Sequence, residues 1–138
     1  VTEDPEISRI TIVVDGDEYI VEQLKKQLNK LINVIKVAII SEDSISRELA
    51  LIKVKATPAN RNEIIEIINI FRAKVVDVNR NSIIVEITGD SKKIAALEEM
   101  LNDFGILEMV RTGNISIDRG SKMVKYTNQK IEEEELNG

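Results

Sequence analysis

The sequence predicts an α+β protein built from two domains with the element order βαββαβ, the first of which lacks its opening strand and helix. Two observations lead to this prediction: segments with strand-like and helix-like hydrophobic spacing alternate along the chain, and one strand–helix–strand pattern occurs twice. The 138 residues, 43% of them apolar and 31% charged, suffice for one ordinary domain or two small ones with a hydrophobic core.

The N-terminal part of the chain predicts a strand, a helix and a second strand. Residues 8–14 are mainly β-branched and apolar, and the turn-forming run Asp-Gly-Asp at 15–17 ends this strand. Apolar residues at helical spacing predict an amphipathic helix over 18–32, with lysines on its other side. Residues 34–40 then alternate between apolar and other side chains, which is typical of a strand.

The rest of the chain predicts six elements. Alternation, helical spacing and turn residues indicate a strand, a helix, a hairpin of two strands, a helix and a strand, over residues 48–56, 60–73, 74–78 with 82–88, 91–104 and 106–110. Gly105 is expected to end the last helix. The predicted organisation is a first domain, a linker, a second domain and a charged tail, over residues 1–41, 42–46, 47–120 and 121–138.

A repeat relates the two halves. When the chain is shifted by about 73 positions, residues 9–17, RITIVVDGD, align with residues 82–90, SIIVEITGD. The apolar positions of the following helices also align, with Leu24 on Leu97 and Leu28 on Leu101. The second half has the whole order strand, helix, strand, strand, helix, strand, whereas the first half has only the last three of these elements.

In a βαββαβ sheet of ferredoxin-like type the first strand is central, because it lies between the third and the fourth. The N-terminal half as given is therefore expected to be unable to close its own sheet. We expect a strand and a helix upstream of Val1, with a rearranged first domain as the alternative.

Composition restricts the possible functions. The chain has neither Cys nor His, which removes thiolate nucleophiles, imidazole bases and almost every transition-metal site. The net charge of −5 and the four aromatic residues offer little to nucleic acid. No segment resembles a membrane span or a signal peptide, so no membrane partner and a cytoplasmic location are expected. Composition favours a binding or structural role.

The chain resembles the small, regulatory subunits of acetolactate synthase, also called acetohydroxyacid synthase. The resemblance extends from Thr2 to about Gly120 and rests on several segments in matching order: TEDPEISRITIVVDGDE (2–18), EQLKKQLNKLINVIKV (22–37), RELALIKV (47–54), IINIFRAKVVDV (67–78), EITGD (86–90) and VRTGNISIDRG (110–120). Such a series is far more specific than one short motif.

The resemblance implies two ACT-type domains, a homodimer, and binding to a large catalytic subunit that carries thiamine diphosphate, FAD and Mg²⁺. The small subunit would activate that enzyme and confer feedback inhibition by a branched-chain amino acid, usually valine. It would be non-catalytic, with no cofactor and no metal of its own. The alternatives are another amino-acid-sensing module of the ACT type and an RNA-binding domain of the same fold, although the strands 48–56 and 82–88 contain no aromatic residue for stacking bases.

The family binds its effector mainly at an Asn- and Gly-containing loop after the first strand of the ACT domain, and that loop has no counterpart in this sequence. Among the residues present, Gln23 and Gln27 lie one helical turn apart and are candidate effector ligands. Surface glutamines are more often solvated or in a dimer contact, and that interpretation stays open.

The helix within 60–73 is expected to contact a second subunit or the other domain, because it is apolar on more than one side. The candidate interface residues are Ile64, Ile65, Ile67, Ile68 and Phe71. The alternative is that all of them belong to one deep core.

Three further features have ordinary explanations. Arg111, the turn after it and Arg119 suit an anion site, although a strand end with ordinary turn residues is the favoured explanation. The acidic run 132–135 is expected to be a solvated end rather than a metal site. Lys25 and Tyr19 are possible acid–base groups, but no nucleophile is placed beside a base, so we expect no catalytic residue.

Overall fold

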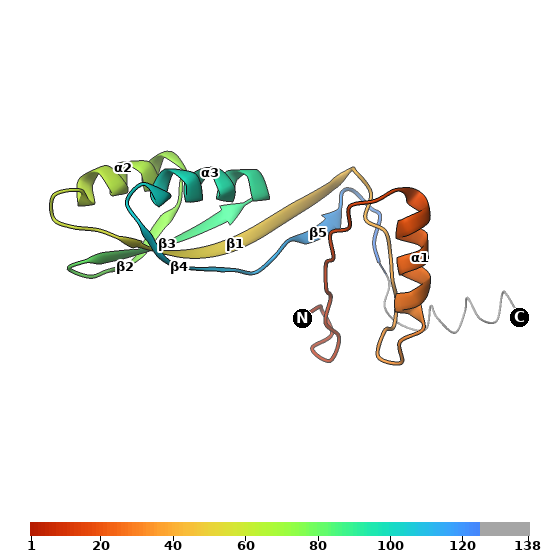
Figure 1. Cartoon of the computed structure of the whole chain (residues 1–138). Helices are drawn as coiled ribbons and strands as arrows, with labels where there is room; N and C mark the ends of the chain where they lie inside the picture. The colour runs from red at the N-terminus through yellow and green to blue at the C-terminus, as the bar shows by residue number, and fades with distance from the viewer. Residues whose placement is uncertain (125–138) are drawn as a thin grey trace, which may run out of the picture. The chain divides into compact units, whose positions relative to one another are not determined.

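The computed structural model describes residues 1–124 (Figure 1). Contacts divide the chain into two compact units. One contains residues 1–11 and 46–115, and the other contains residues 12–45 and 116–124 of the described chain. The first of these is called the sheet unit below, and the second the helix unit.

The elements follow the predicted order over most of the chain. They are α1 (Glu18–Asn29), β1 (Ser44–Lys55), α2 (Arg61–Ile70), β2 (Lys74–Val78), β3 (Ser82–Gly89), α3 (Ser91–Asn102), β4 (Ile106–Arg111) and β5 (Ile115–Asp118). From β1 to β4 these bounds confirm the predicted strand, helix, hairpin, helix and strand. Gly105 has a φ of 103° just after α3, a backbone conformation that favours glycine, which explains why the helix ends there.

The sheet unit has the ferredoxin-like fold. Its strands are ordered β2-β3-β1-β4, and β1 pairs antiparallel with both β3 and β4, so the first strand of the motif is central as expected. The register places Leu51 opposite Glu86 on β3 and opposite Val110 on β4. The helices α2 and α3 lie together on one face of this sheet (Figure 1).

The hydrophobic core lies between the sheet and these two helices. Strand β1 buries every second side chain, and β3 does the same in the complementary positions. The helices contribute apolar positions at i, i+3 and i+4 spacing. The buried apolar residues are Ala50, Ile52, Val54, Ala56, Ile64, Ile67, Ile68, Ile83, Val85, Ile87, Ile94, Leu97 and Leu101.

The N-terminal elements differ from expectation. Helix α1 forms, but it ends at Asn29 rather than at residue 32, and none of its residues is buried. The predictions of strands over 8–14 and 34–40 are wrong, because both segments lack regular strand structure. A strand is defined by a continuous hydrogen-bond ladder with a neighbour, and alternation of side chains along one segment cannot supply that ladder.

The region around the predicted linker also differs. Strand β1 begins at Ser44, within the segment 42–46 that was predicted to be a linker, and the unpredicted strand β5 pairs with β1. The Arg119 amide donates a hydrogen bond to the Asp43 carbonyl oxygen at 3.1 Å. The start of β1 could not be recognised from sequence because it is polar. A strand that lies away from the core needs no alternation of apolar residues.

Candidate functional site

The two copies of the repeat begin their helices in the same way. Asp17 caps α1 by accepting a hydrogen bond from the Ile20 amide at 3.0 Å, and Asp90 caps α3 by accepting one from the Lys93 amide at 2.8 Å. Both caps follow a glycine, and a Cβ at Gly89 would approach the Lys93 side chain to 2.6 Å. The Gly-Asp turn is thus a structural start signal for a helix in both halves.

The candidate effector ligands Gln23 and Gln27 lie on α1. The Gln23 side chain is half-buried and that of Gln27 is exposed. The apolar residues beside them on the same helix, Leu24 and Leu28, are only half-buried. Two neutral amides at the edge of a partly covered apolar surface can bind both an ammonium and a carboxylate group, because each amide both donates and accepts hydrogen bonds.

The expected interface on α2 needs a correction. Ile64, Ile67 and Ile68 are buried in the core of their own unit, so these three side chains are not available to a partner. Ile65 and Phe71 are half-buried and pack against the same core, and for them a partner contact stays a prediction. The helix is apolar on several sides because it contacts both the sheet and α3, while its exposed apolar residue Ile70 is 76% accessible.

Arg111, a candidate anion ligand by sequence, already holds an anion within the chain. Its Nε and one terminal nitrogen donate to the two carboxylate oxygens of Glu48 at 2.7 and 2.8 Å. Glu48 is only 6% exposed, and Arg111 is 37% exposed. The hydrogen bonds from Arg111 lower the pKa of Glu48, although partial burial opposes them. This pair joins the central strand β1 to β4.

Sequence reasoning missed Glu48 and Asp118. Glu48 occupies an inward position of an alternating strand, and a charged residue there needs a partner, which is the signal that could have found it. Asp118, at the end of β5, accepts hydrogen bonds from the Ser41 hydroxyl at 2.7 Å and the Ser41 amide at 2.9 Å. These bonds, with help from Lys122 at 3.7 Å, lower the pKa of Asp118.

Hydrogen bonds hold the loop between β1 and α2 in place. The Asn60 side-chain oxygen accepts from the Thr57 amide at 2.7 Å, and Arg61 donates to the carbonyl oxygens of Asn79 and Arg80 at 3.0 Å each. The side-chain oxygen of Asn60 therefore stabilises the turn. This loop follows the first strand of its domain, the position at which the family resemblance places an effector loop in the other domain.

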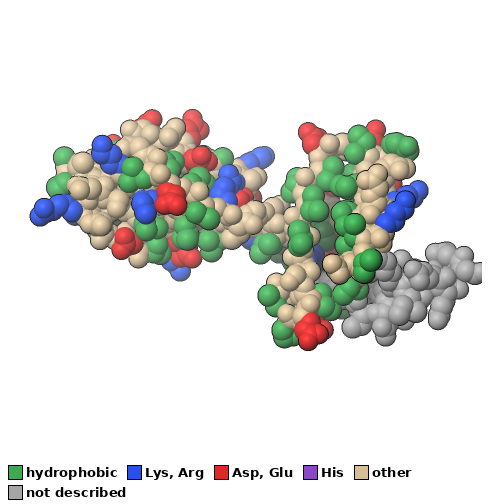
Figure 2. Space-filling model, turned by 60° about the horizontal axis from the view of Figure 1, so that its bottom comes forward, with side chains coloured by type: hydrophobic (Ala, Val, Ile, Leu, Met, Phe, Trp, Pro, Cys, Tyr) green, Lys and Arg blue, Asp and Glu red, His purple; other side chains and the backbone are tan. Residues whose placement is uncertain are grey.

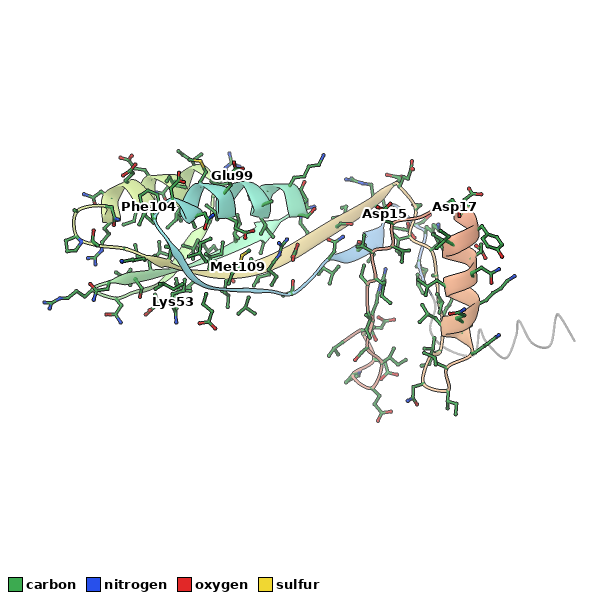
Figure 3. The ribbon with its side chains drawn as sticks, in the orientation of Figure 1. Asp15, Asp17, Lys53, Glu99, Phe104 and Met109 are labelled. Carbon is green, nitrogen blue, oxygen red and sulfur yellow. The ribbon has the colours of Figure 1, made fainter. Side chains whose placement is uncertain are left out.

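The face of the sheet opposite the helices is uncovered. Lys53 projects from this face, away from α2 and α3 (Figure 3). The outward residues of the two central strands include Leu49, Leu51 and Ile84, and none is aromatic. Because RNA-recognition domains of this fold stack bases on aromatic residues of the central strands, this face does not support the RNA-binding alternative.

Other candidate chemistry finds no assembled site in residues 1–124. Within this range no group of three or more acidic residues is placed to hold a metal ion. Tyr19 and Lys25 lie on α1, apart from any residue pair of the kind that nucleophilic catalysis requires. The acidic run 132–135 lies outside the described residues. Of the helices in the described part of the chain, none has the length and hydrophobicity to cross a bilayer.

Two family models match the chain. Residues 47–120 match the model described as the small subunit of acetolactate synthase, and residues 1–36 match the model of the ACT domain found in such small subunits. The first model covers the whole sheet from β1 to β5 except the start of β1. The second covers α1 and both of its flanking segments up to residue 36.

Relatives match along most of the chain. A probable acetolactate synthase small subunit of Archaeoglobus fulgidus is 53% identical over 121 residues, which are 88% of this chain and 76% of that protein. The acetolactate synthase small subunit of Bacillus subtilis is 52% identical over 94% of this chain and 77% of its own length. The crystal structure of the small subunit from Thermotoga maritima superposes with a TM-score of 0.72 at 38% identity, covering 78% of this chain and 68% of that one.

Proposed function

Because the chain belongs to the family of acetolactate synthase small subunits, the regulatory subunits of that enzyme, we propose that it activates a large catalytic subunit and makes that subunit sensitive to a branched-chain amino acid, with valine as the expected effector. The observation that carries the proposal is the identity of about half of the residues to named small subunits over 88–94% of the chain.

The proposed role is regulatory rather than catalytic. The reaction would take place on the large subunit, which would hold thiamine diphosphate, FAD and Mg²⁺, while this chain would contribute binding energy alone. An effector can inhibit only if it binds the inactive assembly more tightly than the active one, and such coupling is typically about 1–3 kcal/mol. Partnership with a biosynthetic enzyme would place the chain in the cytoplasm.

Within this proposal, Gln23 and Gln27 are minor ligands of the amino-acid effector. Both are on α1, beside apolar side chains that are only half-buried. A branched-chain amino acid needs an apolar contact for its side chain and polar groups for its ammonium and carboxylate. The helix offers both kinds of group at adjacent positions.

The experiment is reconstitution. The purified chain is mixed with the large subunit from the same source, and acetolactate formation is followed with and without valine, leucine and isoleucine. We expect the rate to rise on addition of the chain and to fall again with one of the amino acids. An unchanged rate and an unchanged response to all three amino acids would contradict the proposal.

Gln23 and Gln27 can be tested in the same assay. Changing both to Ala is expected to raise the effector concentration needed for half-inhibition while leaving activation intact. The matched control is Glu22→Ala, a change at an exposed residue on the same helix. Equal half-inhibition concentrations in all three proteins would remove these glutamines from the effector site.

A further inference from the structure

Two of the chain's passages between its units belong to one pair of strands. The chain passes from the helix unit to the sheet unit at residues 45–46 and returns at residues 115–116. The first passage lies in β1 and the second in β5, and these strands pair with each other. Residues 44–47 of β1 precede its pairing with β3. A third passage, at residues 11–12, lies in a segment without strand structure. The hydrogen bonds of the strand pair therefore link two of the three passages.

Polar contacts within the helix unit fix the end of this strand pair. We call their four residues, Ser41, Asp43, Asp118 and Arg119, the clasp. The Asp118 carboxylate accepts hydrogen bonds from the Ser41 hydroxyl at 2.7 Å and from the Ser41 amide at 2.9 Å. The Arg119 amide donates to the Asp43 carbonyl oxygen at 3.1 Å, and the Arg119 Nε lies 3.5 Å from the Asp43 carboxylate. The clasp thus ties the residues before β1 to those at the end of β5.

Asp118 is buried in a unit that buries little else. Among the described residues of the helix unit, 12–45 and 116–124, it is the one buried residue. Hydrophobic side chains of this unit lie at the surface in Figure 2, and Ile32 is 99% exposed. Burial of a carboxylate costs free energy unless hydrogen bonds compensate for it. The burial of Asp118 is therefore no by-product of a hydrophobic core, and it depends on the contacts of the clasp.

We propose that the clasp transmits effector binding from the helix unit to the sheet unit, with Asp118 as the positioning residue, an inference that rests on the proposed function. The candidate effector ligands Gln23 and Gln27 are on α1, and the chain that leaves α1 reaches Ser41 before it enters β1. Coupling between distant sites is carried by hydrogen-bond networks and rigid elements. Two strands that are fixed to each other at the clasp transmit a displacement that a single flexible connection would absorb.

The proposal separates effector binding from its effect. Ser41 and Asp118 are not candidate ligands of the effector, so an open clasp leaves the binding residues on α1 unchanged. Inhibition requires that the effector bind the inactive assembly more tightly than the active one. An open clasp removes this difference, because the sheet unit no longer responds to what is bound in the helix unit. The effector then still binds to the chain but inhibits the enzyme less.

The test is Asp118→Ala in the reconstituted enzyme, because this change removes both hydrogen bonds from Ser41. The probe is whichever of valine, leucine and isoleucine inhibits the unmodified complex. Maximum inhibition at saturating effector should fall at least about twofold. Activation without effector, and the dissociation constant of the effector for the free chain measured by calorimetry, should not change. The matched control is Glu42→Ala, which removes an exposed carboxylate beside Ser41 and should keep full inhibition.

Asp118→Asn gives a graded second readout. It keeps the oxygen that accepts from Ser41 and loses only the charge, so it should lose less inhibition than Asp118→Ala.

Three results for Asp118→Ala would overturn the inference while leaving the proposed function in place. Unchanged maximum inhibition would show that the clasp transmits nothing. Equal loss of activation and inhibition would show that Asp118 serves folding or assembly. Weaker effector binding with full inhibition at saturation would make Asp118 part of the binding site. If the unmodified chain itself neither activates the large subunit nor confers inhibition, the proposed function fails, and the inference fails with it.

Discussion

Helices α1 and α3 occupy matching positions of one repeated sequence pattern, and they differ in what surrounds them. Both follow a Gly-Asp turn and are capped by the aspartate, and both run for 12 residues. Helix α3 buries Ile94, Leu97 and Leu101 against the sheet, whereas α1 buries no residue. Local sequence therefore determines where each helix begins, and the central strand β1 with α2 determines whether its apolar side becomes a core.

The largest expected difference between the two copies is in the core itself. Leu97→Ala should lower the free energy of unfolding by about 3 kcal/mol, because the residue is fully buried and leaves a cavity. The equivalent change in the first copy, Leu24→Ala, should cost less than about 1 kcal/mol, because Leu24 is only half-buried. Urea unfolding followed by circular dichroism measures both. Equal losses would show that α1 is packed as tightly as α3.

The next largest effect concerns the ion pair between Glu48 and Arg111 in the second copy. In the first copy the position equivalent to Arg111 is Ala38, which cannot form such a pair. Glu48→Gln should cost about 1 kcal/mol at pH 7, because it weakens two charge-assisted hydrogen bonds to a partly exposed arginine. Since folding lowers the pKa of Glu48, the stabilisation by its charge is complete above the pKa of this carboxyl in the unfolded chain and is lost as the pH falls through its lowered pKa in the folded chain.

Urea unfolding at pH 7 and pH 3 tests this expectation, with Glu63→Gln on the exposed side of α2 as the control. The difference between the Glu48 variant and the unmodified chain should shrink in acid, while the control should match the unmodified chain at both values. A difference that persists unchanged at pH 3 would show that the carboxylate charge is not its cause.

Removal of the capping aspartate is expected to have a global effect on stability in the second copy and only a local effect in the first. Asp90→Ala should lower the global free energy of unfolding by about 1 kcal/mol, because α3 unfolds together with the core. Asp17→Ala should instead reduce local helix content around Ile20, with little change in the main unfolding transition. Amide NMR combined with urea unfolding distinguishes the two results. A global loss from Asp17→Ala would mean that α1 is part of the same cooperative unit.

The smallest effect is expected at Asp118, in the helix unit. Asp118→Asn should speed hydrogen exchange at the Ser41 amide, because the oxygen that accepts from it loses its charge. Ser41→Ala removes the hydroxyl contact and keeps the amide, so it should have a milder effect. The lowered pKa of Asp118 means that the protection is present at neutral pH and is lost as the pH falls through that pKa. Unchanged exchange in both variants would contradict this account.

The sheet unit could be predicted from sequence because its elements carry their own signals. Alternation along β1 and β3, helical spacing in α2 and α3, and the stop at Gly105 are all local patterns. The segments 8–14 and 34–40 show the same alternation without forming strands, because ladder formation depends on neighbours that a local pattern does not reveal.

The candidate site was less predictable for a related reason. Sequence predicts an interface role for Ile64, Ile67 and Ile68 because it shows how apolar a helix is, but not how many sides of that helix its own domain covers. The partnership of Glu48 with Arg111 joins residues 63 positions apart, so only the sheet register reveals it. Sequence likewise does not reveal which face of the sheet α2 and α3 cover, whereas the structure shows both helices on one face.

Native-state hydrogen exchange on the whole chain tests the contrast between the two copies most directly. The amides of Ile94 to Leu101 in α3 should exchange only on global unfolding, and those of Val21 to Leu28 in α1 should exchange at least about 100-fold faster. This difference is expected because, of the two helices, only α3 packs against a complete sheet and a second helix. Equal protection of the two helices would contradict it.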